Sequence, residues 1–281
     1  MTNAIPSGLV TDLVARTLAE DLGGRGDITS LATIPADATA RFDLVSRADG
    51  VLAGDQAARE VFAQVDPLIE AKWLKRDGDR VARGDVVIEL AGPARSLLTA
   101  ERSALNFLGR MSGIATLTRA YVDAVKDTGA AVAHTRKTTP GLRALEIQAV
   151  KSGGGASHRY GLDDAILIKD NHVAVCGSVG EAVRRARAFA GHMTRVAVEI
   201  DRLNQLSDAL EAGAESVLLD NFSLDDLRAA VGVAKGKVTL EASGGVNLNT
   251  VRTIAETGVD IISVGAVTHS ALNFDLGLDE V

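Results

Sequence analysis

The chain contains little cysteine, few aromatic residues and no long apolar run. Cys176 is the only cysteine among 281 residues, so no internal disulfide is possible and a cytoplasmic location is expected. Aromatic residues make up 3%, which argues against a stacking surface for single-stranded nucleic acid. No apolar run reaches the roughly 18 residues of a membrane span. Residues 1–13 lack the basic start and apolar core of a signal peptide, so neither a membrane span nor secretion is expected.

The charge balance is acidic overall but strongly basic in one window. The formal net charge is −7, which argues against non-specific binding to DNA. Residues 134–159 nevertheless hold five Lys or Arg and a single acid, Glu146. Two like charges about 4 Å apart repel by roughly 1 kcal/mol in water and roughly 4 kcal/mol at an effective dielectric of 20. The cluster therefore indicates a multiply charged anionic ligand, with a solvated, salt-bridged surface as the alternative.

Strand-length apolar runs alternate with helical periodicity after residue 130. This alternation predicts βαβ units and a parallel sheet. The expected strands are 130–134, 165–168, 195–200, 215–219, 237–241 and 260–264. The expected helices are 178–191, 203–213, 223–236 and 249–258, with Ser223 and Asn249 as N-caps.

Polar residues follow all six expected strands. In a parallel barrel the carboxyl ends of the strands open on one face, whereas a doubly wound sheet would gather fewer of them around one crevice. We therefore expect a barrel, although six strands are counted and not eight. The residues at these ends include Thr135, Arg136, Lys137, Lys169, Glu199, Asp220, Ser243, Gly244, Gly245, Gly265 and His269.

Glycines and carboxylates refine the expected chemistry. Residues 243–245 (SGG) and 264–266 (VGA) follow the last two strands, where barrels often bind phosphate through backbone N–H groups. Glu199 and Asp220 are expected at the same mouth of the barrel. They could serve there as structural partners, general bases, metal ligands or acceptors for sugar hydroxyls. No HExxH-like spacing exists, so a metal bound by His or Cys is not expected, and Mg²⁺ held mostly by ligand oxygens fits better.

The first 110 residues carry mixed signals. Residues 10–22 have helical spacing, 40–48 and 81–90 are expected strands, and 99–125 is expected to be a long helix broken near Gly113.

Several motifs, in order along nearly the whole chain, resemble those of the quinolinate phosphoribosyltransferase family. They are EDLGGRGDIT (20–29), ERSALNFLGRMSGIAT (101–116), HTRKTTPGLR (134–143), GGGASHRYGLDDAILIKDNH (153–172), VEID (198–201), LLDN (218–221), LEASGGV (240–246) and ISVGAVTHSA (262–271). Two positions depart from the family pattern. Ser157 stands where Asn is usual, and Asp201 stands where Glu is frequent.

The resemblance implies an α/β fold of two domains. Residues 1–105 would form an N-terminal α/β sandwich, on which the tail 270–281 packs back, and residues 106–269 would form an open, incomplete α/β barrel. It also implies a homodimer or larger assembly, in which Arg102 is supplied in trans to the partner's site. No nucleic acid and no membrane would take part.

The resemblance also implies a reaction. Quinolinate and phosphoribosyl pyrophosphate would give nicotinate mononucleotide, pyrophosphate and CO₂, with Mg²⁺ as cofactor. Lys137, Lys169, Glu199 and Asp220 would be catalytic. The substrate-binding set would be Arg102, Thr135, Arg136, Lys137, His158, Arg159, Lys169, Glu199, Asp220, Ser243, Gly244, Gly245, Val264, Gly265, Ala266 and His269.

Three other functions compete with this one. Nicotinate phosphoribosyltransferase acts on a single carboxylate and needs fewer cations. A repurposed paralogue, such as a binding protein associated with molybdate uptake, would keep the barrel without turnover. A phosphate-binding barrel of unrelated chemistry would not explain where the cations lie.

Overall fold

A computed structural model describes residues 5–281 and divides the chain into two compact units. Unit 1 comprises residues 1–119, 138–154 and 270–281, and unit 2 comprises residues 120–137 and 155–269. The boundary expected between residues 105 and 106 therefore falls inside a helix, and two later segments return to unit 1.

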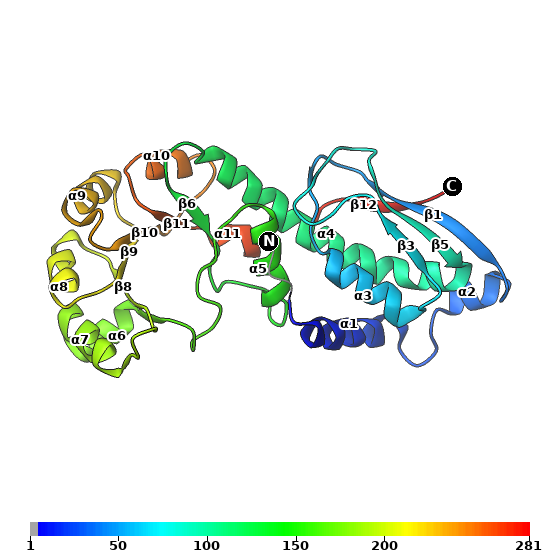
Figure 1. Cartoon of the computed structure of the whole chain (residues 1–281), viewed down its shortest axis with the longest axis horizontal. Helices are drawn as coiled ribbons and strands as arrows, with labels where there is room; N and C mark the ends of the chain where they lie inside the picture. The colour runs from blue at the N-terminus through cyan, green and yellow to red at the C-terminus, as the bar shows by residue number, and fades with distance from the viewer. Residues whose placement is uncertain (1–4) are drawn as a thin grey trace. The chain divides into compact units, whose positions relative to one another are not determined.

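Unit 1 is an antiparallel sheet with helices. Its four-stranded sheet has the order β12-β1-β5-β3, so the last strand of the chain pairs with the first (Figure 1). The strands are β1 (Thr39–Ser46), β3 (Glu70–Trp73), β5 (Val86–Pro93) and β12 (Leu276–Glu280), with a separate pair β2 (Gly50–Val51) and β4 (Arg80–Val81). The helices are α1 (Ser7–Leu22), α2 (Ile28–Thr33), α3 (Asp55–Val65), α4 (Ala94–Ala124, whose last residues belong to unit 2) and α5 (Arg143–Ser152).

Helix α4 is continuous, so the break expected near Gly113 is wrong. A Cβ atom built on Gly113 would lie 1.9 Å from the carbonyl oxygen of Leu272. The glycine is therefore needed because the C-terminal segment crosses α4 in direct contact with its backbone, not because the helix ends there.

Unit 2 is an open parallel barrel. Its six strands have the order β6-β11-β10-β9-β8-β7, and Figure 1 shows helices α7 to α10 along their outer side. The first strand pairs with the last, as barrel closure requires, while β6 and β7 form no ladder with each other. The helix between them, α5, belongs to unit 1. The barrel is thus open between its first two strands, which explains why six strands suffice.

All six predicted strands of unit 2 are confirmed. They are β6 (Ala131–Ala133), β7 (Ile166–Ile168), β8 (Val196–Ile200), β9 (Ser216–Asp220), β10 (Thr239–Ser243) and β11 (Ile261–Ser263). The helices are α6 (Asp170–Cys176), α7 (Val179–Phe189), η1 (Leu203–Gln205), α8 (Leu206–Glu211), α9 (Leu224–Ala234), α10 (Val251–Ala255) and α11 (Ala266–His269). Ser223 caps α9 by accepting the Asp226 N–H. The cap predicted at Asn249 is wrong, because α10 begins only after Thr250 and Asn249 instead donates its N–H to Asn247.

Candidate active site

The carboxyl ends of the unit 2 strands enclose a cavity of about 410 Å³. Nine of the residues predicted from the sequence line it, together with Leu167, Leu218, Glu241 and Ser263. The nine are Thr135, Arg136, Lys137, His158, Arg159, Lys169, Glu199, Asp220 and Ser243. Because parallel strands all end at this edge, side chains far apart in sequence meet here.

Two arginines form the basic wall of the cavity. The Nε atoms of Arg136 and Arg159 are both buried without a hydrogen-bond partner. Burial, and next the charge of Arg136, lower the pKa of the Arg159 guanidinium from its usual value. Arg159 also donates from Nη1 to the Ala165 carbonyl at 3.2 Å, which orients its guanidinium. Buried donors of this kind are rarely left unpaired, so the wall is suited to an anion with at least two acceptor groups.

Lysines and carboxylates alternate beside the arginine wall. Lys169 Nζ lies 2.5 Å from Glu199 Oε2, after β7 and on β8 respectively. Asp220 ends β9 and accepts a hydrogen bond from Asn221 Nδ2 at 2.8 Å. Carboxylate oxygens accept more than one hydrogen bond, so this pair suits sugar hydroxyls, a cationic sugar or a metal-bound ligand.

The Asn221 side chain lies against Gly244. Asn221 has a left-handed backbone with φ of +56°, and its N–H donates to the Ser243 carbonyl at 2.9 Å. A Cβ atom on Gly244 would lie 2.1 Å from Asn221 Oδ1, and Gly244 itself has φ of +95°. The predicted glycine at 244 is thus required both by its conformation and by the close approach of Asn221.

A second glycine, Gly265, lies between the side chains of Lys137 and His269. A Cβ atom on Gly265 would meet Lys137 Cδ at 3.1 Å and His269 Nε2 at 3.2 Å. Thr268, one turn along, donates through its hydroxyl to the Lys137 carbonyl at 2.7 Å. The loop after β11 is therefore held against the loop after β6.

The remaining predicted residues lie outside the cavity lining. Gly244 and Gly245 follow β10, Val264 and Gly265 follow β11, Ala266 and His269 are the two ends of α11, and Arg102 belongs to unit 1. Arg102 is exposed on α4, where the following residues 103–105 are buried.

Comparison with known proteins identifies the family. The quinolinate phosphoribosyl transferase N-terminal domain model matches residues 27–112, and the C-terminal domain model matches residues 114–279. A curated nicotinate-nucleotide pyrophosphorylase [carboxylating] of Mycobacterium leprae is 46% identical over 273 residues, covering 95% of this chain and 96% of its own. A probable enzyme of the same name from Bacillus subtilis is 43% identical over 260 residues, covering 92% and 89%.

The chain belongs to the quinolinate phosphoribosyltransferase family.

Solved structures agree with this assignment. The nicotinate-nucleotide pyrophosphorylase of Francisella tularensis has a TM-score of 0.95 and 41% identity, covering 99% of this chain and 98% of its own. The expected α/β fold of this quinolinate phosphoribosyltransferase family member, an antiparallel sheet unit and an open parallel barrel, is confirmed.

Sequence reasoning did not select three polar residues of the site. Glu241 and Ser263 line the cavity, and Asn221 bonds to Asp220 beside it. Glu241 falls at the end of the expected strand 237–241, and a lone acid in LEAS has no motif spacing that would mark it as a site residue. The position of Glu241 relative to His158 depends on how the strands of the barrel are aligned with one another.

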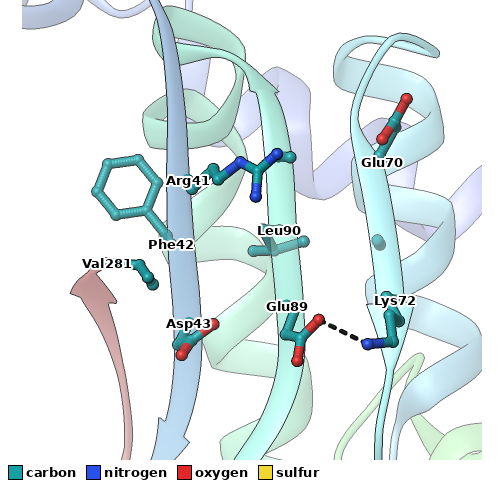
Figure 2. Close-up of a pocket in the computed structure, with 10 residues that line it drawn as sticks. Arg41, Phe42, Asp43, Glu70, Lys72, Glu89, Leu90 and Val281 are labelled. Carbon is teal, nitrogen blue, oxygen red and sulfur yellow. Dashed lines mark hydrogen bonds and ion pairs between the residues drawn. The ribbon is translucent and has the colours of Figure 1, made fainter.

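A larger hollow, of about 590 Å³, lies on the sheet of unit 1. Figure 2 shows acids and bases alternating over its strands, with Lys72 paired to Glu89 at 2.9 Å. Because the charges there are mixed and exposed, this hollow is a solvated sheet face and the smaller basic cavity remains the candidate site of this family member.

The part of the chain that the structure describes contains neither a membrane helix nor a ready-made metal centre. Within residues 5–281, no helix has the length and apolar character that crossing a bilayer requires. Among the same residues, no three His, Cys, Asp or Glu side chains form a group that could hold a metal ion.

Proposed function

We propose that the protein is a decarboxylating quinolinate phosphoribosyltransferase of NAD biosynthesis. It would transfer the phosphoribosyl group from phosphoribosyl pyrophosphate to the ring nitrogen of quinolinate, giving nicotinate mononucleotide, pyrophosphate and CO₂. The names of the relatives at 43–46% identity support this reaction.

The observation that carries the proposal is the pair of half-buried arginines whose Nε atoms are buried. Arg136 and Arg159 present Nε groups that have no partner within the protein, in a cavity that also contains Lys137 and Lys169. Quinolinate carries two adjacent carboxylates, and a guanidinium binds a carboxylate through two parallel hydrogen bonds. A monocarboxylate such as nicotinate would leave part of this wall unpaired, which disfavours the runner-up enzyme.

The phosphate groups would bind on the side of the late strands. Backbone N–H groups with little side-chain bulk are offered by Ser243 at the end of β10, by Gly244 and Gly245 after it, and by Val264, Gly265 and Ala266 after β11. His269 and Lys137 flank Gly265, so a cation and a hydrogen-bond donor lie beside this loop. We propose that the 5′-phosphate is bound here.

Charge development would drive the transfer step. As the bond between the anomeric carbon and pyrophosphate breaks, the sugar gains oxocarbenium character and the leaving group gains negative charge. Glu199 or Asp220 would stabilise the cationic sugar, and Lys137 and Lys169 would stabilise pyrophosphate. Mg²⁺ bound by substrate oxygens, with Glu199 or Asp220, would neutralise pyrophosphate charge.

Decarboxylation would follow from the product of that step. Once the ring nitrogen has formed its bond to the sugar, it is a positively charged pyridinium. The adjacent carbon–carboxylate bond then breaks, its electron pair stays on the ring carbon beside the pyridinium, and that carbon takes up a proton. Arg136 and Arg159 would hold the second carboxylate throughout, which keeps the ring in place.

Product analysis tests the proposal. Purified protein is incubated with phosphoribosyl pyrophosphate, Mg²⁺ and either quinolinate or nicotinate, and nicotinate mononucleotide and CO₂ are followed. Turnover with quinolinate alone is expected. Turnover with nicotinate would favour the second enzyme, and ligand binding without turnover would favour a binding paralogue of the same fold.

We further propose a homodimer whose sites are completed by the partner's Arg102. The exposure of Arg102 beside buried neighbours on α4 supports a role outside its own core. Mixing inactive Arg102→Ala with inactive Lys169→Ala should restore activity, because one kind of site in the mixed dimer keeps both residues. No recovery, with subunit exchange demonstrated, would contradict completion in trans.

A further inference from the structure

A chain of hydrogen bonds connects the two arginine loops behind the cavity wall. The backbone N–H of His158 donates to His134 Nε2 at 3.1 Å, and His134 Nδ1 lies 3.2 Å from the Thr135 carbonyl. His134 is completely buried. The segment that carries Arg159 is therefore held to the segment that carries Arg136 through one imidazole ring.

The same series of hydrogen bonds fixes the ring of His158. The Arg159 backbone N–H donates to His158 Nδ1 at 2.8 Å, so this nitrogen is an acceptor and the ring proton is on Nε2. His158 Nε2 lies 3.3 Å from Glu241 Oε1. Both nitrogens of His158 are thus engaged within the protein, unlike the arginine Nε groups beside it.

The series of hydrogen bonds ends at Glu241, a buried carboxylate in the same cavity as the two arginines. Glu241 on β10 is 8% exposed, and the buried hydroxyl of Ser263 on β11 donates to the same Oε1 atom. A carboxylate here works against binding of a dianion, so its presence requires a compensating role. Holding the Nε2–H of His158 is the role that its contacts support.

We infer that Glu241 is a positioning residue that, through His158 and His134, sets the orientation of Arg136 and Arg159 toward the two carboxylates of the substrate. This inference rests on the proposed function. In this arrangement the His158 ring fixes the loop that carries Arg159, in addition to lining the cavity, and the guanidinium groups bind the anion.

Two substitutions of Glu241 separate this role from others. Glu241→Ala leaves the buried His158 Nε2–H without an acceptor, so the dissociation constant for quinolinate should rise about tenfold or more. Glu241→Gln keeps an amide oxygen that accepts from His158 and Ser263, and it also removes the unfavourable negative charge. It should therefore recover most of the lost affinity.

Calorimetry with quinolinate alone and with phosphoribosyl pyrophosphate alone measures the effect. Binding of phosphoribosyl pyrophosphate should change less than about threefold in both variants, because the loops after β10 and β11 keep their other contacts. Unchanged quinolinate binding by Glu241→Ala would overturn the inference. Equal weakening of both substrates, without recovery in Glu241→Gln, would also overturn it.

A ligand-free measurement on wild-type protein keeps the test independent of activity. Nitrogen-15 NMR of histidine-labelled wild-type protein should show His158 with its proton on Nε2 and His134 with its proton on Nδ1, assigned with His→Gln variants. A His158 proton on Nδ1 would overturn the inference. If wild-type protein shows these tautomers but binds no quinolinate, the proposed function fails while the hydrogen-bonded chain stands.

Discussion

Arg136→Ala should weaken substrate binding and stabilise the free protein at the same time. In the complex, the substituted protein loses a charge-assisted hydrogen bond between a buried guanidinium and a carboxylate. Removing one partner of such a pair costs about 2–5 kcal/mol, or about 30-fold to several thousandfold in affinity for quinolinate. Affinity for phosphoribosyl pyrophosphate should fall far less, because its 5′-phosphate would bind on the side of β10 and β11 and its pyrophosphate would meet Lys137 and Lys169.

The free protein should respond in the opposite direction. Its Arg136 Nε is buried without a partner, and the charge of Arg136 lowers the pKa of Arg159. Removing the guanidinium relieves both costs, and a relief of about 1 kcal/mol would raise the melting temperature by roughly 2–4 °C for a chain of this size. Weaker quinolinate binding together with a higher melting temperature is expected only where a residue is retained for binding and not for folding.

Isothermal calorimetry measures the expected fall in quinolinate affinity, and thermal unfolding of ligand-free protein measures the expected rise in melting temperature. Arg228→Ala serves as the control, since Arg228 is an exposed cation of the same unit, paired with Asp225 at 2.8 Å. Its removal should leave both substrate affinities and the melting temperature nearly unchanged. An Arg136→Ala protein that melts several degrees lower and loses both substrates equally would show that Arg136 is structural, and would refute the reasoning.

Three further predictions concern backbone contacts and a buried acid. Burial, and next a neighbouring carboxylate, raise the pKa of Asp77 to about 6, so its ionisation lowers the unfolding free energy as the pH rises from about 4 to about 6. The free energy of unfolding of Asp77→Asn, measured by urea titration, should therefore rise relative to that of the wild type by up to about 3 kcal/mol between pH 4 and pH 7. A difference between the two proteins that does not change with pH would contradict this. Gly244→Ala should lower kcat/KM for phosphoribosyl pyrophosphate at least about tenfold, because the new Cβ displaces Asn221 or strains the loop by about 1–3 kcal/mol; unchanged kinetics would contradict it. Gly113→Ala should destabilise unit 1 by more than about 2 kcal/mol in denaturant unfolding, since its Cβ would overlap the Leu272 carbonyl; a stability near wild type would show that the C-terminal segment moves away easily.

The sequence by itself determined the parallel sheet and most of the cavity. Strand periodicity and the polar residues at strand ends are local signals, and parallel strands necessarily bring their carboxyl ends together. Arg136, Lys169 and Asp220 could therefore be grouped from the sequence although they are far apart in it. The family motifs then added the reaction expected of that group.

Only the tertiary structure decided which polar groups are partnered and which are available to a ligand. Glu241 on β10 meets His158 because the segment before His158 pairs with β6 at Ala156 and Ala133, and no sequence spacing encodes that approach. Gly113 is a second example. In the sequence it resembles a helix break, whereas in the fold it lets the C-terminal segment pass in contact with the backbone of α4. Hydrogen-bond partners and close backbone approaches arise between distant segments, so they become visible only after the chain has folded.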